Sequence, residues 1–283
     1  MLEWEPTEIK NNNRKQVEMI AKAKIAGIVV ATVAVITGGT TGAVRALSSY
    51  TVYDDFNSAK RGMYGSEYEL SGNFDVAYTY SNISIDDGIL TLKIDKNTDP
   101  RFSAGQTGGE YHTGKAYGYG YYEVSMIPID NPGVVSSFFT FAGDENSNSV
   151  AEIDIEFPGN NTHVVDFNYY VNGIGNHGFT YDLGFDASED FHSYGFLWVE
   201  DSITWFVDGI PVYRLTDKDD AIPSVESQIY LNAWTGSEAV KGWIDIYDGT
   251  APLYAKYDYF SFTEQKKVDK SVFDLIEEYL PQQ

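Results

Sequence analysis

The chain has 283 residues, of which 43% are hydrophobic and 15% aromatic, and this length and composition suit one domain with a sizeable core, or at most two domains. Its 42 Asp and Glu residues outweigh 19 Lys and Arg residues and give a net charge of −23, and so acidic a surface repels nucleic-acid phosphates and argues against DNA or RNA as a partner. The absence of cysteine excludes disulfides and thiolate metal sites.

The first predicted element is an apolar segment near the N-terminus. Ile25–Val44 carries no charged residue and is just long enough to span a bilayer, which takes about 20 residues. Lys22 and Lys24 precede it, and basic residues on that side predict that the N-terminal end stays in the cytoplasm. The pattern fits a signal peptide that is cut after Ala46, or a membrane anchor that holds the rest of the chain outside the cell. Residues 1–46 are therefore predicted to be an export or tethering segment outside the fold.

The middle of the chain, from Tyr50 to Thr263, consists of short alternating apolar runs separated by turn residues. In 83–94, and again in 202–213, an Asp-Gly pair separates two such runs, which is a strong signal for a β-hairpin. Many short strands at this spacing, with no long helical pattern, predict an all-β fold that is a sandwich or a barrel. We expect this domain to extend over residues 50–265.

Only the tail, residues 266–283, has a helical pattern. Lys270–Leu280 is the predicted helix, and Pro281 ends it. We expect the helix to cap the sandwich, although a helix that binds a partner fits the same pattern. Its apolar positions fall on one face: Val272, Phe273, Ile276, Tyr279 and Leu280.

The segment with the clearest chemistry is Glu152–Phe157. Its alternation with period two predicts a strand that turns Ile153, Ile155 and Phe157 toward the core. Glu152, Asp154 and Glu156 then share the opposite face, where like charges repel one another and where strands disfavour carboxylates. Because a structural purpose does not select this arrangement, a function is expected to compensate for it. A calcium site or a solvated acidic strand are the alternatives, but calcium sites usually lie in loops.

Glycoside hydrolysis needs such carboxylates. A retaining glycosidase holds two carboxyl groups about 5–5.5 Å apart, one to attack the anomeric carbon and one to protonate the leaving oxygen. Residues four apart on a flat strand have Cα atoms roughly 13 Å apart, so Glu152 and Glu156 must lean inward on a curved strand. The charge of Asp154 between them would raise the pKa of the acid and keep it protonated near neutral pH.

The same segment carries a family resemblance. Glu152–Phe157, with a Gly two residues later, resembles the signature of the bacterial lichenases of glycoside hydrolase family 16. Over roughly Tyr53 to Thr263, further stretches are similar to this family in the same order: Tyr117–Met126, Gly133–Thr140, Phe167–Gly173, Leu183–Ala187, Trp205–Gly209, Leu231–Trp234 and Pro252–Asp258.

The resemblance implies a concanavalin-like jelly-roll sandwich with the carboxylate strand on its concave face. It further implies that Glu152 is the nucleophile, Glu156 the general acid/base and Asp154 the carboxylate that modulates them. Family members that cleave pure β-1,3 chains usually have one extra residue in this strand. Its absence here favours the lichenase-like branch.

Other residues match positions that bind substrate or metal in the family. The implied substrate-binding residues are Glu110, His112, Phe139, Phe141, Asp166, Asn168, Tyr170, Asn232 and Trp234. The resemblance also implies a structural calcium ion held by the carboxylate of Asp258 and the backbone carbonyls of Asp55 and Gly88, all of them oxygen ligands as calcium prefers. No cofactor is expected for catalysis.

The chain departs from the family at the rim of the implied cleft. The family has Trp-Asp before the first catalytic Glu, an Arg, a Gln and a Tyr in the cleft, and in many members a disulfide. The corresponding residues here are Val150 and Ala151, His112, Asp166, Phe141, and Val76 with Gly108. The catalytic residues are therefore intact, whereas the residues that choose the substrate differ.

Three functions fit this pattern. The first is hydrolysis of mixed-linkage β-1,3-1,4-glucan by an extracellular, monomeric endo-β-glucanase. The second keeps the chemistry but changes the acceptor or polymer, as in a transglycosylase or an enzyme that trims exopolysaccharide, which a membrane anchor would suit. The third is a glycan-binding module without catalysis, but such a protein would tend to lose Glu152 or Glu156, and both are present.

Overall fold

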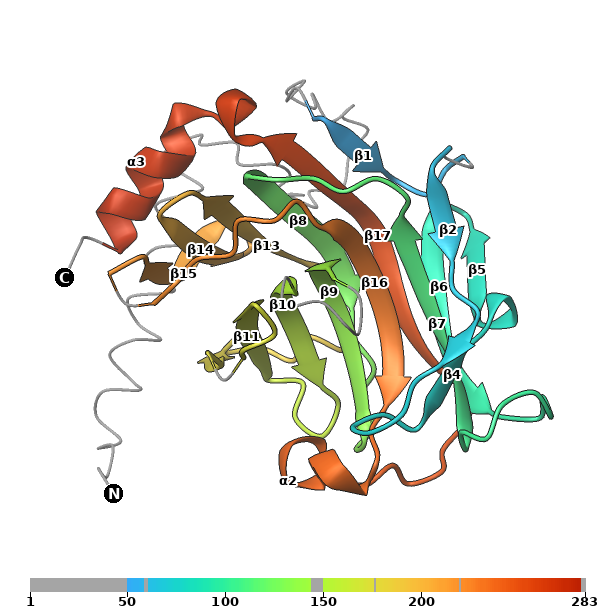
Figure 1. Ribbon diagram of the computed structural model, residues 1–283. Helices are drawn as coiled ribbons and strands as arrows, with labels where there is room; N and C mark the ends of the chain where they lie inside the picture. Colours follow the sequence, from blue (N-terminus) through green and yellow to red (C-terminus); the bar gives the residue numbers. More distant parts are fainter. Residues whose placement is uncertain (1–49, 59–60, 144–149, 176, 219, 281–283) are drawn as a thin grey trace, which may run out of the picture.

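The computed structural model describes residues 50–58, 61–143, 150–175, 177–218 and 220–280. The predicted export segment, residues 1–46, lies outside this part of the chain. None of the helices in the described ranges has the length and apolar character needed to cross a bilayer. The described residues form an all-β sandwich with a few short helices, which agrees with the predicted fold class (Figure 1).

Two antiparallel layers make up the sandwich. The first layer has the strand order β5-β6-β17-β8-β13-β14-β15, with β1 also paired to β17. Its strands are β1 (Val52–Asp54), β5 (Ile83–Asp86), β6 (Ile89–Lys96), β8 (Gly120–Ile127), β13 (His192–Val199), β14 (Ser202–Val207), β15 (Ile210–Thr216) and β17 (Leu253–Glu264).

The second layer has the order β2-β7-β16-β9-β10-β11-β12. Its strands are β2 (Met63–Gly65), β7 (Gln106–Thr113), β9 (Val134–Ala142), β10 (Ala151–Pro158), β11 (Val164–Val171), β12 (Phe179–Asp182) and β16 (Gln228–Thr235). At one edge β3 (Tyr68–Glu69) pairs with β4 (Val76–Tyr78), β4 runs parallel to β7, and a short pairing of β6 with β7 joins the two layers.

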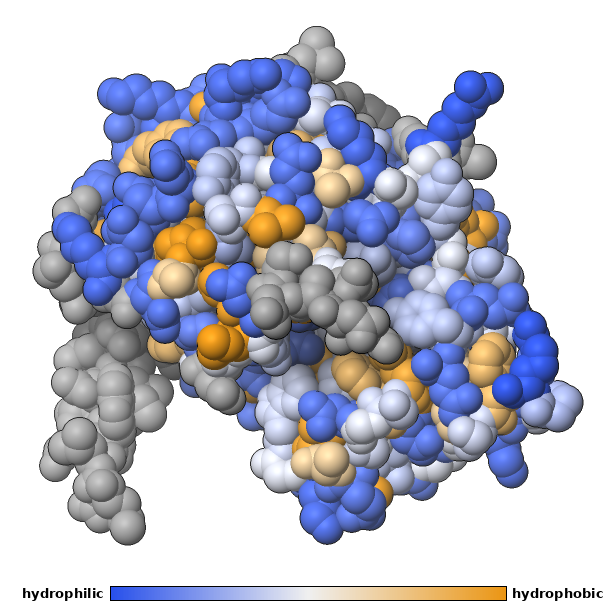
Figure 2. All heavy atoms as spheres, viewed as in Figure 1, coloured by the Kyte–Doolittle hydropathy of each residue, from blue (hydrophilic) through white to orange (hydrophobic). Residues whose placement is uncertain are grey.

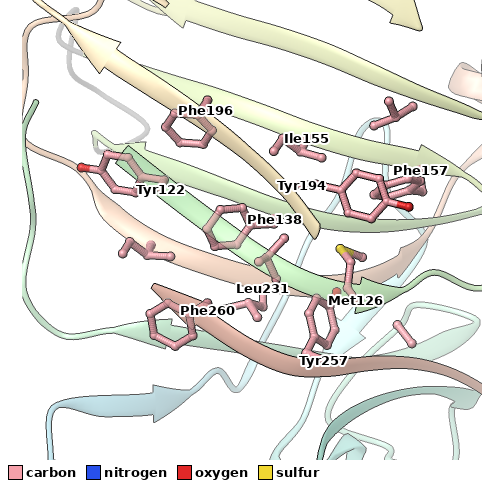
Figure 3. Packing of buried hydrophobic residues seen from close by; sticks show 14 of the residues in the cluster. Tyr122, Met126, Phe138, Ile155, Phe157, Tyr194, Phe196, Leu231, Tyr257 and Phe260 are labelled. Carbon is pink, nitrogen blue, oxygen red and sulfur yellow. The ribbon is translucent and has the colours of Figure 1, made fainter. Parts of the chain in front are cut away.

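The core lies between the layers and is dominated by aromatic rings (Figure 3). Phe157 of β10 meets Tyr194 of β13 with 4.7 Å between ring centroids, and Phe138 of β9 lies 6.3 Å from Phe196 of β13. Each fully buried ring of this size contributes roughly 1.5–3 kcal/mol through removal of apolar surface from water. The side of the molecule shown in Figure 2 is largely hydrophilic, as the excess of acidic residues leads one to expect.

Both predicted Asp-Gly hairpins are present. Asp87 and Gly88 join β5 to β6 with φ values of 48° and 77°, and Asp208 and Gly209 join β14 to β15 with 49° and 74°. Positive φ at both central residues is the turn whose twist matches that of a hairpin, and Gly adopts it without steric cost.

The predicted C-terminal helix is α3 (Lys270–Tyr279), and it packs on the outer side of the first layer. The Asp269 carboxylate caps it by accepting a 2.8 Å hydrogen bond from the backbone N–H of Ser271. Its buried residues are Val272, Leu275 and Ile276, so the buried face includes Leu275, whereas Tyr279 and Leu280 are only half-buried. Val272 and Ile276 join a second apolar cluster with Tyr121, Leu197, Val199 and Phe206.

The expectation that only the tail is helical is wrong. A short helix, α2 (Lys241–Ile244), follows a 3₁₀ turn over Glu238–Val240, and two further 3₁₀ turns lie at Tyr80–Asn82 and Gln265–Lys267. Segments this short have no sequence periodicity from which a helix can be recognised. Tertiary packing fixes α2 instead, because Ile244 is fully buried beside Trp234.

Candidate active site

Strand β10 lies between β9 and β11, and its three carboxylates point away from the core. We call this outer surface of the second layer the site face. Phe141 and Tyr170 flank Glu152, Phe139 and Asn168 flank Asp154, and Ser137 and Asp166 flank Glu156.

The core side of β10 explains how the strand tolerates these charges. Ile153, Ile155 and Phe157 are at most 1% exposed, as their alternation predicted. The indole N–H of Trp205 from the first layer also donates to the backbone carbonyl of Asp154 at 3.2 Å. Hydrophobic burial and this bond hold the strand in place and present its carboxylates on the other face.

Burial raises the pKa of all three carboxyl groups. Asp154 is fully enclosed, and the charges of Glu152 and Glu156 raise its pKa further, which keeps it neutral and able to donate a hydrogen bond to Glu152. Burial raises the pKa of Glu152 to about 7, against the lowering effect of that hydrogen bond. Burial, the charge of Glu152 and the charge of Asp166 raise the pKa of Glu156 to about 8. The strand thus holds carboxyl groups whose pKa values are raised toward neutral pH, as a group that acts as an acid there needs.

A row of rings crosses the site face from β9 to the edge strand β2. Phe139 stacks on Tyr230 with 5.1 Å between centroids, Tyr230 stacks on His112 at 5.0 Å, and His112 lies 6.0 Å from Tyr64. Phe141 meets the edge of Tyr230 at 6.3 Å. Sequence reasoning placed Phe139, Phe141 and His112 here but missed Tyr230 at the centre, although period two backward from Asn232 points to it.

Glu110 and Asn232 occupy the neighbouring row on β7 and β16. The Glu110 carboxylate accepts hydrogen bonds from Ser66 Oγ at 2.6 Å, Tyr68 Oη at 3.0 Å and Asn232 Nδ2 at 3.4 Å. Asn232 Nδ2 also donates to Tyr78 Oη at 3.0 Å. Burial raises the pKa of Glu110, and these three donors oppose the rise. The structure therefore brings the two predicted residues together in a fixed polar network.

Comparison with known proteins agrees with this architecture. A model of the family "Glycosyl hydrolases family 16" matches residues 70–252. The chain belongs to glycosyl hydrolase family 16. A β-glucanase of Paenibacillus polymyxa is 42% identical over 69% of this chain and 79% of that protein. A xylanase/β-glucanase of Ruminococcus flavefaciens is 43% identical over 77% of this chain, and this match spans only 27% of the longer relative.

Two solved structures of the family have the same fold. A prokaryotic β-1,3-1,4-glucanase (lichenase) from a mouse hindgut metagenome is 43% identical, with a TM-score of 0.70 over 75% of this chain and 97% of that one. The Bacillus licheniformis β-glucanase is 38% identical, with a TM-score of 0.70 over 76% of this chain and 98% of that one.

In this family 16 chain, Asp166 joins β11 to α2. Asp166 lies on the site face, and its carboxylate accepts hydrogen bonds from the Trp243 indole N–H at 2.6 Å and from Thr180 Oγ1 at 2.5 Å. Trp234 shares that face but is only 4% exposed, because Phe74 and Trp243 cover it. The accessible indole here is that of Trp243, which lies on the unpredicted helix α2 and therefore gave no sequence signal.

The residues that the family 16 resemblance implies for calcium meet at one corner of the first layer. Asp258 is exposed where the register of β17 shifts between Tyr257 and Tyr259. Pairing of β17 with β1 and β6 brings the end of β1 and the β5–β6 turn to this bulge. Asn57 lies between Asp55 and Gly88, since its Nδ2 donates to the Asp55 carbonyl at 3.1 Å and a side chain at Gly88 would press on its Oδ1. The described residues hold no group of three His, Asp or Glu side chains that could bind a metal, so a calcium ion at this corner would depend on the backbone carbonyls.

Proposed function

We propose that the chain is a retaining endo-β-glucanase that hydrolyses mixed-linkage β-1,3-1,4-glucan. The observation that carries the proposal is the row of three carboxyl groups on β10, with Asp154 buried between two half-buried glutamates and aromatic rings on the same face. Aromatic rings offer flat apolar platforms on which sugar rings can stack. The choice of polymer rests on the lichenase, which is 43% identical and matches over nearly its whole length.

In the proposed reaction Glu152 is the nucleophile and Glu156 the acid. The Glu152 carboxylate attacks the anomeric carbon, while Glu156 gives its proton to the glycosidic oxygen, and the bond between that carbon and oxygen breaks. A water molecule then gives a proton to the Glu156 carboxylate and its oxygen to the anomeric carbon, which releases Glu152. The pKa of about 8 at Glu156 supports its role, because the group carries its proton at neutral pH.

Asp154 is proposed to modulate this pair. Its neutral carboxyl donates a hydrogen bond to Glu152, which favours the ionised form of the nucleophile. A charged Asp154 would instead repel both glutamates. The group therefore acts by remaining protonated while Glu152 is ionised.

Replacement of the nucleophile tests the mechanism. In Glu152→Ala no covalent glycosyl-enzyme can form, so hydrolysis should fall to below about a hundredth of wild type. Azide should restore turnover of an activated glycoside and give a product of inverted configuration, because the anion fills the vacated space. An Ala variant that retains its activity would remove Glu152 from this role. Glu110→Ala is a useful comparison because it also removes a buried carboxylate from the site face, but azide should not rescue it.

A panel of β-glucans with product masses tests the substrate. Cleavage of mixed-linkage glucan into short oligosaccharides supports the proposal. Products longer than the starting oligosaccharide would identify a transglycosylase instead. Cleavage of other polymers alone would refute the mixed-linkage assignment and leave the carboxylate mechanism in place.

We further propose a structural calcium ion held by Asp258 and the carbonyls of Asp55 and Gly88. Bound there, it would tie β17, the end of β1 and the β5–β6 turn together. Removal by EDTA should lower the melting temperature, and Asp258→Asn should abolish the response to added calcium. An unchanged melting temperature in both experiments would rule out the ion.

The chain is also proposed to act outside the cytoplasm as a monomer, delivered by residues 1–46. A fusion of these residues to a reporter that is active only outside the cytoplasm should be active. A soluble, inactive fusion would refute export. The size of the mature chain distinguishes a cleaved signal peptide from an anchor, and light scattering tests the monomer.

A further inference from the structure

A cavity of about 810 Å³ lies at the β2 edge of the second layer and is separate from the carboxylate strand. Two of its lining residues, His112 and Tyr64, are also the last two rings of the aromatic row on the site face. Four strand spacings of about 4.8 Å each, or roughly 19 Å, separate the carboxylates on β10 from the end of the row on β2. A glycan that lies across the strands over these rings therefore enters the cavity several sugar residues from the point of cleavage.

The cavity gathers two cations that form no ion pair with the described residues, although the charge of Lys115 helps to lower the pKa of Glu264. Arg61 and Lys115 both line it, and no ion pair of the described chain includes either of them. Most other described basic residues are paired with carboxylates: Lys93, Arg101, Arg214, Lys241, Lys266, Lys267 and Lys270. Two unpaired cations beside one cavity are notable in a chain with 42 acidic and 19 basic residues.

The rest of the lining suits a sugar. The Lys115 ammonium lies 5.3 Å above the Tyr117 ring, and Tyr64 supplies a second, largely exposed ring. One acidic residue, Asp54, also lines the cavity, but it is 2% exposed and its carboxylate accepts a 3.0 Å hydrogen bond from the backbone N–H of Phe56. The accessible charge of the cavity is thus positive, with aromatic walls.

We propose that this cavity binds a carboxylate on an acidic form of the polymer, such as a uronic acid residue, which unmodified mixed-linkage glucan does not carry. The inference rests on the proposed function, because the glycan must occupy the site face to reach the cavity. Arg61 and Lys115 would hold the carboxylate, and Tyr64 and Tyr117 would contact the ring that bears it. On so acidic a protein, this local pair of cations offsets the repulsion that an anionic polymer otherwise meets.

The test compares neutral mixed-linkage glucan with the same glucan after partial oxidation of its primary hydroxyls to carboxylates. In Arg61→Ala/Lys115→Ala, kcat/KM for the oxidised glucan should fall about tenfold or more, and kcat/KM for neutral glucan should be unchanged. The wild-type preference for oxidised glucan should also shrink as salt is added. The control Lys218→Ala/Lys256→Ala removes two charges away from the cavity and should leave both substrates unaffected.

Equal losses on both substrates, or none, would overturn the proposal. Wild-type cleavage of neutral glucan tests the proposed function separately. If neutral glucan is not cleaved at all, titration of Glu152→Gln with an oxidised gluco-oligosaccharide still decides whether Arg61 and Lys115 bind a carboxylate.

An independent observation concerns His177, between β11 and β12. Pairing of β12 with β11 ends at Phe167, and beyond it the His177 ring covers the edge of β11. The ring stacks on Tyr169 with 4.0 Å between centroids, its Nδ1 lies 2.8 Å from the Tyr169 carbonyl oxygen, and its Nε2 lies 3.0 Å from Asp220 Oδ2. The ring therefore lies between two hydrogen-bond acceptors, a backbone carbonyl on one side and a carboxylate on the other.

His177 in turn contacts the site. Its backbone N–H donates to Asn168 Oδ1 at 3.2 Å, and the Asn168 side chain hydrogen-bonds to the Tyr170 hydroxyl. Asn168 lies directly opposite Asp154 on β10. We infer that His177 is a positioning residue: its ring contacts Tyr169 and Asp220, and its backbone N–H thereby holds the Asn168 amide beside the carboxylates.

A double-mutant cycle separates positioning from a structural role. His177→Ala should lower kcat/KM about tenfold in the wild type and hardly at all in an Asn168→Ala background. Asp220→Ala, which leaves the ring in place, should behave in the same way if His177→Ala folds poorly. His163→Ala, at an exposed histidine 3.9 Å from Asp186, is the control and should have no effect. Additive losses in the double-mutant cycle would overturn the inference.

Discussion

Each face of the sandwich has carboxyl groups on a central strand, but the hydrogen-bond partners of these groups differ between the two faces. On the outer side of the first layer, Glu123 of β8 is 1% exposed and accepts hydrogen bonds from Tyr121 Oη at 3.0 Å and Tyr259 Oη at 2.7 Å. On the site face, Asp154 and Glu152 hydrogen-bond to each other, and neither forms an ion pair with a described Lys or Arg. Burial raises the pKa of Glu123 to about 7, much as it does on β10.

A raised pKa therefore does not by itself distinguish these two regions. Glu123 has a donor for each oxygen and lies beneath tyrosine rings, with Tyr53 stacked on Tyr259 at 5.7 Å. The carboxyls of β10 crowd one another and adjoin a row of rings on the site face. The lesson is that satisfied partners mark a structural carboxyl, whereas mutual repulsion beside a binding surface marks a reactive one.

The largest expected contrast is in activity. Glu156→Gln should lower kcat/KM on glucan by about a hundredfold to ten-thousandfold, because the amide cannot protonate the leaving oxygen. Glu123→Gln should leave activity within about twofold. For an aryl glycoside whose leaving group needs no proton, kcat/KM of Glu156→Gln should fall far less. If both variants lose activity alike, the distinction between the two faces fails.

The stability of both variants should depend on pH in the same direction. The pKa of Glu123 rises from 4.5 in the unfolded chain to about 7 in the folded one, so the folded state binds the extra proton. The stability linked to that proton is fully present below pH 4.5 and is lost as the pH rises through 7, a cost of about 3 kcal/mol by pH 8. Gln, which mimics the protonated acid, should therefore stabilise the protein at pH 8 and change little at pH 4.5.

Denaturant titrations of both variants at the two pH values measure this effect. Glu156→Gln should also be more stable than wild type at pH 8, because the pKa of Glu156 is likewise raised in the folded state. Unlike Glu123→Gln, it should lose most of its activity. A Glu123→Gln variant that is no more stable at pH 8 than wild type would show that its tyrosine partners require the carboxylate.

Much of the second layer could be predicted from the sequence. The alternation in β10 set the directions of all six side chains from Glu152 to Phe157, and period two placed Asp166, Asn168 and Tyr170 together on β11. Both Asp-Gly turns followed from the need for positive φ. These features are local, because each depends only on residues within a few positions of one another.

What could not be predicted depends on contacts between distant segments. Trp243 reaches Asp166 across 77 positions, and α2 is too short to leave a periodic pattern. The burial of Glu123 could not be predicted, because its partner Tyr259 lies 136 residues away in the sequence. The sequence likewise did not indicate that Trp234 would be covered, since Phe74 and Trp243 come from other elements.

The smallest expected effect concerns Asp166, and it separates the contribution of this residue to the pKa of Glu156 from those of burial and Glu152. Its charge is the last of the three causes that raise the pKa of Glu156, after burial and Glu152. In wild type, kcat/KM should rise through a pKa near 7 as Glu152 ionises and fall through a pKa near 8 as Glu156 loses its proton. Asp166→Asn removes the repulsive charge and keeps an oxygen for Trp243, so the alkaline limb should move to lower pH by less than one unit.

Trp243→Phe is the matched control, because it removes the 2.6 Å hydrogen bond and leaves the charge of Asp166 in place. Its alkaline limb should stay where it is in wild type or move slightly upward, since an unpaired carboxylate repels the ionised Glu156 at least as strongly. The acidic limb, set by Glu152 two positions further along the site face, should not change in either variant. An alkaline limb that stays fixed in Asp166→Asn would mean that burial and Glu152 alone hold the proton on Glu156, and that the carboxylate of β11 serves only to seat Trp243.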